Sequence, residues 1–417
     1  MAERKSVPDI RFAGFGGGWE RRRAADLAEY SKGQGYSKSD LAESGTPIIL
    51  YGRLYTRYKF LIDDVDTFAV AKSGSVFSQG GEVIVPASGE TADDIARASA
   101  VAKPGILLGG DLNILRPVEQ MNPVFLAISL SNGESREELA RKAQGKSVVH
   151  IHNSDIQEIS VSFPSRAEQD RIVDGFMRLD DLIESMQHKL AALANFKKAM
   201  LDKMFPKDGA AVPEIRFTGF GGDWERRKLG EFSDIKTGPF GSTLHADDYI
   251  NDGIPIITTE HFKSGQLPAV KNGIPQVSDN DYSRLSSYIL NSGDIVFSRV
   301  GSVDINALVT ILQDKWLFSG RVLRVRPCAE IDSMFLHTLL ETDDVRNDII
   351  ARAVGQTMPS INTEILKITS LCLPRDIDEQ RKIGEFFHRI ENLITLHQRK
   401  LDCLRNIKEA CLEKMFV

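Results

Sequence analysis

Two stretches of the chain, residues 161–206 and 376–417, carry apolar residues in a regular alternation of four and three. A repeat of about 3.5 residues over several heptads predicts long helices that supercoil around each other. The first seam consists of Ile172, Phe176, Leu179, Ile183, Met186, Leu190, Leu193, Met200 and Met204. The second consists of Ile383, Phe387, Ile390, Ile394, Leu401, Leu404, Cys411 and Met415. We infer that the two helices pair within the chain. Pairing of each seam with a partner subunit is the alternative.

The rest of the chain has a different pattern. Short β-type runs such as Ile48–Tyr51 and Asp294–Phe297 alternate with turn-forming Gly, Pro, Asn and Asp residues and with helical stretches. This mixture indicates irregular α/β domains. The predicted fold class is therefore α+β. We expect domains at 1–160 and 207–375, with long helices at 161–206 and 376–417 that form an antiparallel coiled coil between them.

The sequence is also duplicated. Residues 8–23 read PDIRFAGFGGGWERRR, and residues 213–228 read PEIRFTGFGGDWERRK. Pro164-x3-Glu168-Gln169 corresponds to Pro374-x4-Glu379-Gln380, and both copies end on Lys-Met-Phe. Lys197 and Lys408 interrupt the two seams at the same register. A repeat of this length predicts two similar domains related by an approximate two-fold arrangement.

Composition adds little to this picture. Net charge is −6, with 42% hydrophobic and 26% charged residues, which is ordinary for a soluble globular protein. No apolar stretch is long enough to span a membrane, and the first residues do not resemble a secretory signal. The four cysteines form no metal-binding pattern, so we expect free thiols in a reducing cytoplasm.

Motifs for catalysis are weak or incomplete. Ala140–Ser147 lacks the first glycine of a P-loop, and the glycines after Gly14 and Gly219 lack the third glycine of a dinucleotide loop. His150 and His152 have the spacing of metal ligands, but no acidic or cysteine cluster completes the set. Asp234-Ile-Lys236 has the acid-x-Lys pattern of metal-dependent nucleases, without a counterpart in the first copy. We therefore expect no catalytic residue, no metal and no cofactor in this chain.

Polar, aromatic and basic residues instead gather on loops that differ between the copies. Arg can form bidentate hydrogen bonds to guanine or phosphate, and polar side chains can read base edges in the major groove of DNA. In the first copy the candidates are Tyr36, Arg53, Tyr55, Arg57, Tyr58, Ser88, Glu90 and Thr91. In the second they are Ser242, Thr243, Thr258, Glu260, His261, Arg299, Ser302 and Gln356. Two equivalent scaffolds that carry different loops are expected to recognise two different DNA sequences.

The order of these features resembles the specificity subunits of type I restriction–modification systems, over nearly the whole chain. The matching motifs are Arg-Phe-x-Gly-Phe-x-Gly-x-Trp-Glu at the start of each half, Gly238-Pro-Phe-Gly-Ser242, Ser88-Gly-Glu-Thr91, Gly293-Asp-Ile-Val before Ser298-Arg299, and Glu-Gln-x-x-Ile in both halves. In the first copy, Gly33-Gln-Gly-Tyr-Ser37 departs from Gly-Pro-Phe-Gly-Ser, which leaves the role of that loop open.

The resemblance implies two target-recognition domains separated by paired helices, in a cytoplasmic protein that binds double-stranded DNA. It also implies assembly with two methyltransferase subunits and two restriction/translocase subunits, and those partners use S-adenosylmethionine, Mg²⁺ and ATP. Two other classes remain: a coiled-coil scaffold for protein interactions, and a self-contained nuclease or methyltransferase.

Overall fold

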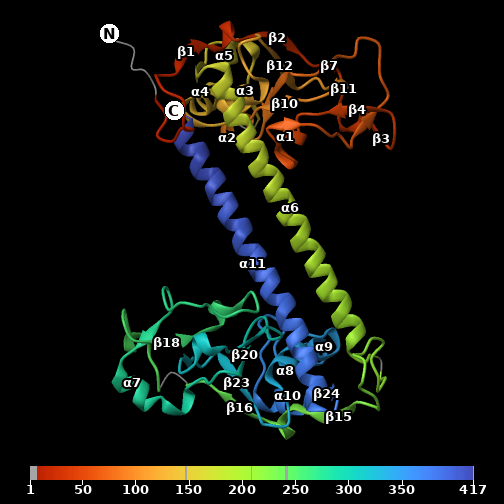
Figure 1. The fold of residues 1–417 in the computed structure, drawn as a ribbon, viewed down its shortest axis with the longest axis vertical. Helices are drawn as coiled ribbons and strands as arrows, with labels where there is room; N and C mark the ends of the chain where they lie inside the picture. The colour runs from red at the N-terminus through yellow and green to blue at the C-terminus, as the bar shows by residue number, and fades with distance from the viewer. Residues whose placement is uncertain (1–6, 146–147, 208, 240–242, 417) are drawn as a thin grey trace. The chain divides into compact units, whose positions relative to one another are not determined.

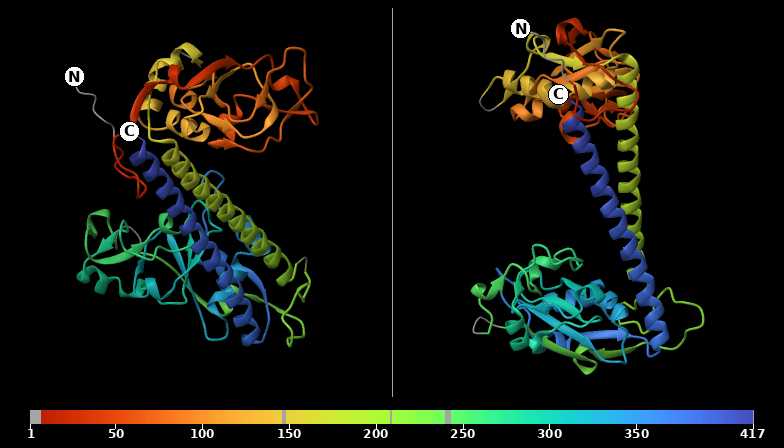
Figure 2. Two further views of the ribbon diagram at one scale, coloured as in Figure 1. Left: turned by 45° about the horizontal axis from the view of Figure 1, so that its top comes forward. Right: turned by 60° about the vertical axis from the view of Figure 1, so that its left-hand side comes forward.

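The two heptad stretches form the long helices α6 (Arg166–Met204) and α11 (Ile377–Met415), of 39 residues each. Figure 1 shows both in the computed structural model, which describes residues 7–145, 148–207, 209–239 and 243–416. Two compact units share these helices (Figure 2). Unit 1 comprises Met1–Gln187 with Arg399–Val417, and unit 2 comprises His188–Gln398. In both units the beginning of one helix packs on the end of the other, so the helices pair antiparallel.

The predicted seams lie on the inner sides of the helices. On α6, Ile172, Phe176 and Met204 are buried, and Leu179, Ile183, Met186, Leu190, Leu193 and Met200 are half-buried. On α11, Ile383, Phe387, Ile390, Leu401 and Met415 are buried, and Ile394, Leu404 and Cys411 are half-buried. Lys197 and Lys408 are also half-buried. The burial thus keeps the 4,3 spacing along each whole helix, as expected when an apolar stripe faces a partner helix.

The body of unit 1 contains two five-stranded sheets. The first has the order β2-β12-β8-β10-β5, formed by Ala28–Lys32, Leu112–Pro117, Val83–Pro86, Ser99–Val101 and Leu61–Ile62. The second has the order β3-β6-β4-β11-β7, formed by Leu41–Ala42, Phe68–Ala69, Thr46–Ile49, Pro104–Leu108 and Phe77–Gln79. The short helices are α1 (Arg53–Thr56), α2 (Ala92–Ile95), α3 (Pro123–Leu130), α4 (Gly133–Lys142) and α5 (Asn153–Gln157). Two short ladders pair β1 (Glu20–Arg23) with β14 (Ser160–Phe163) and β9 (Ser88–Gly89) with β13 (Val149–His150).

The body of unit 2 repeats this plan with shorter sheets. One has the order β16-β23-β20-β21, formed by Ser233–Thr237, Val322–Pro327, Ile295–Ser298 and Asn306–Leu308. The other has the order β17-β19-β18-β22, formed by Tyr249–Ile250, Gln276–Val277, Ile254–Ile257 and Leu317–Phe318. The helices are α7 (Asp279–Arg284), α8 (Ser333–Leu340), α9 (Asp343–Arg352) and α10 (Thr363–Ile368), and β15 (Glu225–Lys228) pairs with β24 (Ser370–Leu373). The central strands β8 and β20 are buried along their whole length in their units, which explains their apolar sequences.

The repeated sequence motifs hold each body to the start of its long helix. Arg11 forms a bidentate ion pair with the buried carboxylate of Glu168, at 2.6 and 2.7 Å, and Arg216 does the same with Glu379. The neighbouring glutamine accepts a hydrogen bond from the backbone N–H that precedes α3 or α8, at 2.8 Å for Gln169 and 2.9 Å for Gln380. The Arg-Phe and Glu-Gln motifs therefore form one clamp in each unit, because buried carboxylates need such charged partners.

Four aromatic rings form the centre of each unit at the same place. In unit 1, Phe416 lies 5.6–6.2 Å from the rings of Trp19, Phe125 and Phe176, measured between centroids. In unit 2, Phe205 lies 5.8–5.9 Å from those of Trp224, Phe335 and Phe387. Gly133 adopts φ +60°, and a Cβ there would lie 2.5 Å from the carbonyl oxygen of Phe416. The Met-Phe that ends each sequence repeat is therefore a core residue pair, and the end of α11 completes the core of unit 1.

The remaining expectations about composition concern cysteines and membranes. All four cysteines are described, and none forms a disulfide. Of the helices in the described residues, none has the length and hydropathy needed to cross a bilayer.

Candidate nucleic-acid interface

In unit 1, two of the predicted loop segments meet at the short ladder of β9 and β13. Ser88 lies opposite His150 in this ladder, and the Ser88 hydroxyl is 3.3 Å from Nδ1 of His150. Tyr55 of α1 donates its phenolic hydrogen bond to the Ser88 carbonyl at 2.5 Å, and burial raises the pKa of this phenol. Glu90 and Thr91 follow on the exposed side, where Thr91 caps α2. The Tyr55–Ser88 hydrogen bond thus holds segment 51–59 beside segment 88–91.

In unit 2, the corresponding segments meet in the same way. Val300 bridges Ser360, and the Ile361 amide donates to the Arg299 carbonyl at 2.9 Å. In unit 1 the Ile151 amide donates to the Ala87 carbonyl at 3.1 Å. Ser302 is exposed at the end of the first segment, and Gln356 is exposed on the second. Arg299 and Gln356, 57 positions apart in the sequence, therefore belong to one pair of loops.

The second member of each loop pair is a small hairpin. Gln144 and His150 exchange backbone hydrogen bonds of 3.1 and 2.8 Å, and Val354 and Ser360 exchange two of 2.9 Å. Gly145 follows Gln144, and Gly355 follows Val354. Both glycines have a positive φ, +139° and +105°, and a side chain at either position would strike the opposite backbone of the hairpin. Their exposed residues include Val148, Val354 and Met358. Of the hairpin residues, only Gln356 is among the DNA-contact candidates predicted from the sequence. The matched glycines Gly145 and Gly355 are the sequence feature that indicates a hairpin in both copies.

Arg53 and Arg57 lie on α1 and just after it, and they share one carboxylate. Arg53 donates to Asp66 at 2.9 Å and to the Asp64 carbonyl at 2.6 Å, and its side chain is 15% exposed. Arg57 also donates to Asp66, but its side chain is 64% exposed. The two guanidinium groups hold the pKa of Asp66 below its usual range. Arg53 is therefore mainly structural, whereas Arg57 presents its charge to solvent.

Replacing Arg57 by alanine is expected to weaken DNA binding of the assembled complex by about 1–3 kcal/mol, if Arg57 makes a bidentate base contact. Replacing Arg53 should instead lower the stability of unit 1 modestly, because Asp66 and the Asp64 carbonyl lose the hydrogen bonds of a partly buried guanidinium. Affinity by fluorescence anisotropy and thermal unfolding separate the two effects. Arg178→Ala, at an exposed position on α6, is the matched control. Equal affinity for the Arg57 variant and the control would contradict this role.

The other candidates differ in their exposure and in their contacts. Tyr58 packs against Phe60 in the core of unit 1 and donates to the Ala98 carbonyl, so its ring offers little surface for DNA. Tyr36 is half-buried and bonds Ser75, with Lys72 over its ring. Thr258 and His261 form a capping box, and burial lowers the pKa of His261. Glu260 is exposed and pairs with Lys263, Thr243 is half-buried, and Ser242 lies outside the described residues.

The weak motifs for catalysis have structural roles. An alternating His-x-His spacing would place both histidines on one face of a strand, but β13 ends at His150, and His152 precedes α5 as its N-cap. Asp234 on β16 pairs with Arg324, and Lys236 lies 4.6 Å above the ring of Tyr288. In the Ala140–Ser147 segment α4 ends at Lys142, and residues 146–147 lie outside the described part.

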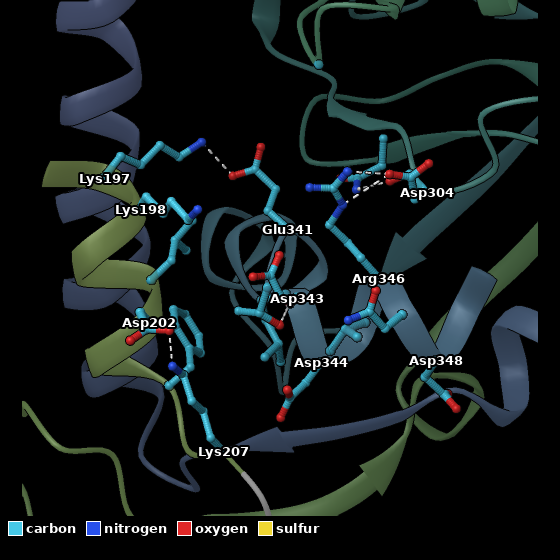
Figure 3. A pocket seen from close by; sticks show the side chains of 18 of the residues that line it. Lys197, Lys198, Asp202, Lys207, Asp304, Glu341, Asp343, Asp344, Arg346 and Asp348 are labelled. Carbon is cyan, nitrogen blue, oxygen red and sulfur yellow. Dashed lines mark hydrogen bonds and ion pairs between the residues drawn. The ribbon is translucent and has the colours of Figure 1, made fainter. Parts of the chain in front are cut away.

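Unit 2 also contains a half-buried charged cluster beside a cavity of about 1360 Å³ between the end of α6 and the α8–α9 region. Figure 3 shows lysines of the α6 end on one side and Glu341, Asp343, Asp344 and Asp348 on the other. Ligand atoms of His337, Glu341 and Glu391 lie within 4.8 Å of one another, which would suit a metal ion. Lys197 donates to both carboxylates at 2.7 Å, so its ammonium already supplies the positive charge there. Sequence analysis did not anticipate this cluster.

Comparison with known proteins agrees with this architecture. The family model described as "Type I restriction modification DNA specificity domain" matches residues 16–195 and again residues 221–406. The type I restriction enzyme MjaVIII specificity subunit of Methanocaldococcus jannaschii is 23% identical over 404 residues, covering 94% of this chain and 91% of that protein. The MjaIX specificity subunit of the same organism is 22% identical, covering 76% of this chain and 73% of that protein.

Solved structures share the fold. A crystal structure of a type I restriction–modification S subunit from M. genitalium has a TM-score of 0.67 at 15% identity, covering 99% of both chains. A structure described as concerning complex assembly and conformational transition of the type I R-M system has a TM-score of 0.51 at 16% identity, covering 94% of this chain and 96% of that one.

Two family matches, one for each copy, confirm both the resemblance seen in the sequence motifs and the predicted fold class. The duplicated body, the paired long helices and the loop pairs of the two units are the features that these matches span. The chain belongs to the type I restriction modification DNA specificity domain family, as a specificity subunit with two DNA target-recognition domains.

Proposed function

We propose that each unit reads one half of a bipartite DNA sequence through its loop pair. The observation that carries this proposal is the recurrence of the same loop and hairpin on both scaffolds with different side chains: Ser88 and His150 in unit 1, Val300 and Ser360 in unit 2. A common frame with different exposed residues reads different base edges, so the target is asymmetric.

The recognised half-sites would be separated by bases that are not contacted. Because each body packs against both long helices, the helix pair would set the distance between half-sites, on the order of one turn of DNA. The net charge of −6 provides little general attraction to phosphate, so the affinity would depend on local contacts and on partner subunits.

The chemistry would come from the partners. We propose assembly with two methyltransferase subunits, and with two restriction/translocase subunits in the restricting complex, in the cytoplasm. Those subunits would bind S-adenosylmethionine, Mg²⁺ and ATP, whereas this chain would bind no cofactor and catalyse no step. The motifs considered for catalysis support this, because Asp234, Lys236 and His152 serve the fold.

Exchanging residues 36–150 for those of a related specificity subunit is expected to replace one half-site and leave the other unchanged. The exchanged segment contains α1, β9 and the first hairpin, while unit 2 keeps its own loops. Mapping methylated adenines in cells that carry the chimera and the partner subunits measures this. The unexchanged chain is the control. A target altered in both halves, or in neither, would contradict separate reading by the two units. Methylation or cleavage of DNA by the purified chain alone would favour a self-contained enzyme.

A further inference from the structure

Lys197 joins three elements of unit 2. It lies on the apolar seam of α6 and donates one hydrogen bond of 2.7 Å to Glu391 of α11. A second bond of 2.7 Å goes to Glu341, which directly follows α8 in the body (Figure 3). The side chains of Lys197, Glu391 and Glu341 are 19%, 17% and 22% exposed. Burial lowers the pKa of Lys197, but the two carboxylates outweigh it and raise the pKa, so the lysine stays charged.

Lys408 likewise joins both long helices to the body in unit 1. It lies on the seam of α11 and donates to Asp180 of α6. Its ammonium is also 4.5 Å from the centroid of the Phe60 ring in the core of the body, a favourable cation–π distance. Each lysine thus connects its own helix, an acidic residue of the other helix, and the body of its unit.

The two ion pairs are reciprocal. Asp180 and Lys197 are 17 residues apart on α6, and Glu391 and Lys408 are 17 residues apart on α11. Each acidic residue directly follows a seam residue, Leu179 or Ile390. The same contact therefore forms in both units, with the roles of the helices exchanged.

The apolar seam alone leaves the register of the helices open, because a shift of seven residues again places apolar residues opposite apolar ones. The lysines do not tolerate that shift. Moving one helix by a heptad would place Lys197 opposite Gly384 or Gln398, and Lys408 opposite Val173 or Gln187. None of these residues is acidic, and a half-buried ammonium without its carboxylate is strongly unfavourable.

We propose that the Lys197–Glu391 and Lys408–Asp180 pairs lock the register of α6 against α11 and thereby determine which separation of half-sites the subunit accepts. This rests on the function proposed for the chain. These four residues touch no DNA; they position the reading bodies. The ion pairs act together with the aromatic anchors Phe205 and Phe416, because a seven-residue shift would separate each lysine from its acidic partner and would also withdraw these rings from the cores.

The test compares DNA duplexes that carry the mapped target with its natural spacer, or with a spacer three base pairs longer or shorter, because a seven-residue shift of about 10 Å corresponds to about three base pairs. The variant Lys197→Met/Glu391→Gln/Lys408→Met/Asp180→Asn removes the four charges while nearly preserving side-chain volume. In complex with the methyltransferase subunits, its preference for the natural spacer is expected to fall by at least about tenfold. Its affinity for the natural target should change little, because the loops are intact. A merely structural defect would lower binding to all three duplexes equally and leave their ratio unchanged.

Lys198→Met/Lys400→Met is the matched control, because these lysines lie on the same helices at exposed positions; it should keep the preference of the natural chain. If the fourfold variant does not fold, Lys408→Asp is compared with Lys408→Asp/Asp180→Lys, which restores the pair in reverse. The exchange should recover the spacer preference that the single change loses. Equal preference in the fourfold variant and the natural chain, or no recovery on exchange, would overturn the lock. If the natural complex shows no sequence-dependent binding, the proposed function fails, and the lock with it.

Discussion

Replacing Phe416 by alanine is expected to lower the free energy of unfolding of unit 1 by about 3–5 kcal/mol, the range for removing a buried phenylalanine. The ring is buried among Trp19, Phe125 and Phe176, and the tight approach at Gly133 leaves the surrounding backbone little freedom to close the cavity. Because the chain has two units, unfolding is not a two-state process for the whole molecule. Hydrogen exchange of peptides from each unit measures the loss directly.

The effect should be confined to unit 1, with β2, β12 and α3 losing protection and unit 2 remaining near its natural stability. Phe205→Ala should give the converse pattern, because Phe205 has the same surroundings in unit 2. Phe77→Ala is the control for the size of the change, since that ring is exposed in unit 1. Similar protection in the Phe416 and Phe77 variants would show that the end of α11 is not part of the core.

Replacing Glu379 by alanine is expected to cost about 3–5 kcal/mol in unit 2, because it removes one partner of a buried ion pair. Glu379 is nearly inaccessible, and it accepts two hydrogen bonds from Arg216 at 2.6 and 2.7 Å. Without the carboxylate, Arg216 keeps only its bonds to the carbonyls of Gly221 and Gly222. Of the clamp, only Gln380 would then still hold the start of α11 to the body. Urea unfolding followed through the fluorescence of Trp224 and Trp316 reports this loss.

Glu330→Ala is the matched control. Glu330 pairs with Arg227 at 3.2 Å in the same unit, but its side chain is mostly exposed, so its removal should cost less than about 1 kcal/mol. Glu168→Ala should reproduce the large effect in unit 1, where Arg11 makes the equivalent clamp. A Glu379 variant no less stable than the Glu330 variant would show that the clamp does not stabilise the fold.

The sequence predicts the parts of this protein that depend on local periodicity. The 4,3 spacing from Ile172 to Met204 and from Ile383 to Met415 follows from 3.6 residues per helical turn, so it identifies both helices and their inner faces without other information. The duplication identifies the two bodies because similar sequences form similar folds. The exposure of loop residues is harder to predict. The Arg-Tyr pattern of 51–59 does not distinguish exposed Arg57 from Tyr58, which packs against the core, because a short irregular segment has no fixed period that relates position to burial.

Long-range pairing is what only the tertiary structure decided. The Met-Phe that ends each repeat is visible in the sequence, but nothing local shows that Phe416 completes a core with Trp19, nearly the whole chain away. Lys197 and Lys408 appear in the sequence as interruptions of a seam. In the structure they pair with Glu391 and Asp180 of the other helix, because an antiparallel arrangement brings those positions together. Heptad spacing encodes which face of a helix is buried; the partner of each buried charge depends on direction and register, which arise only when the helices pack.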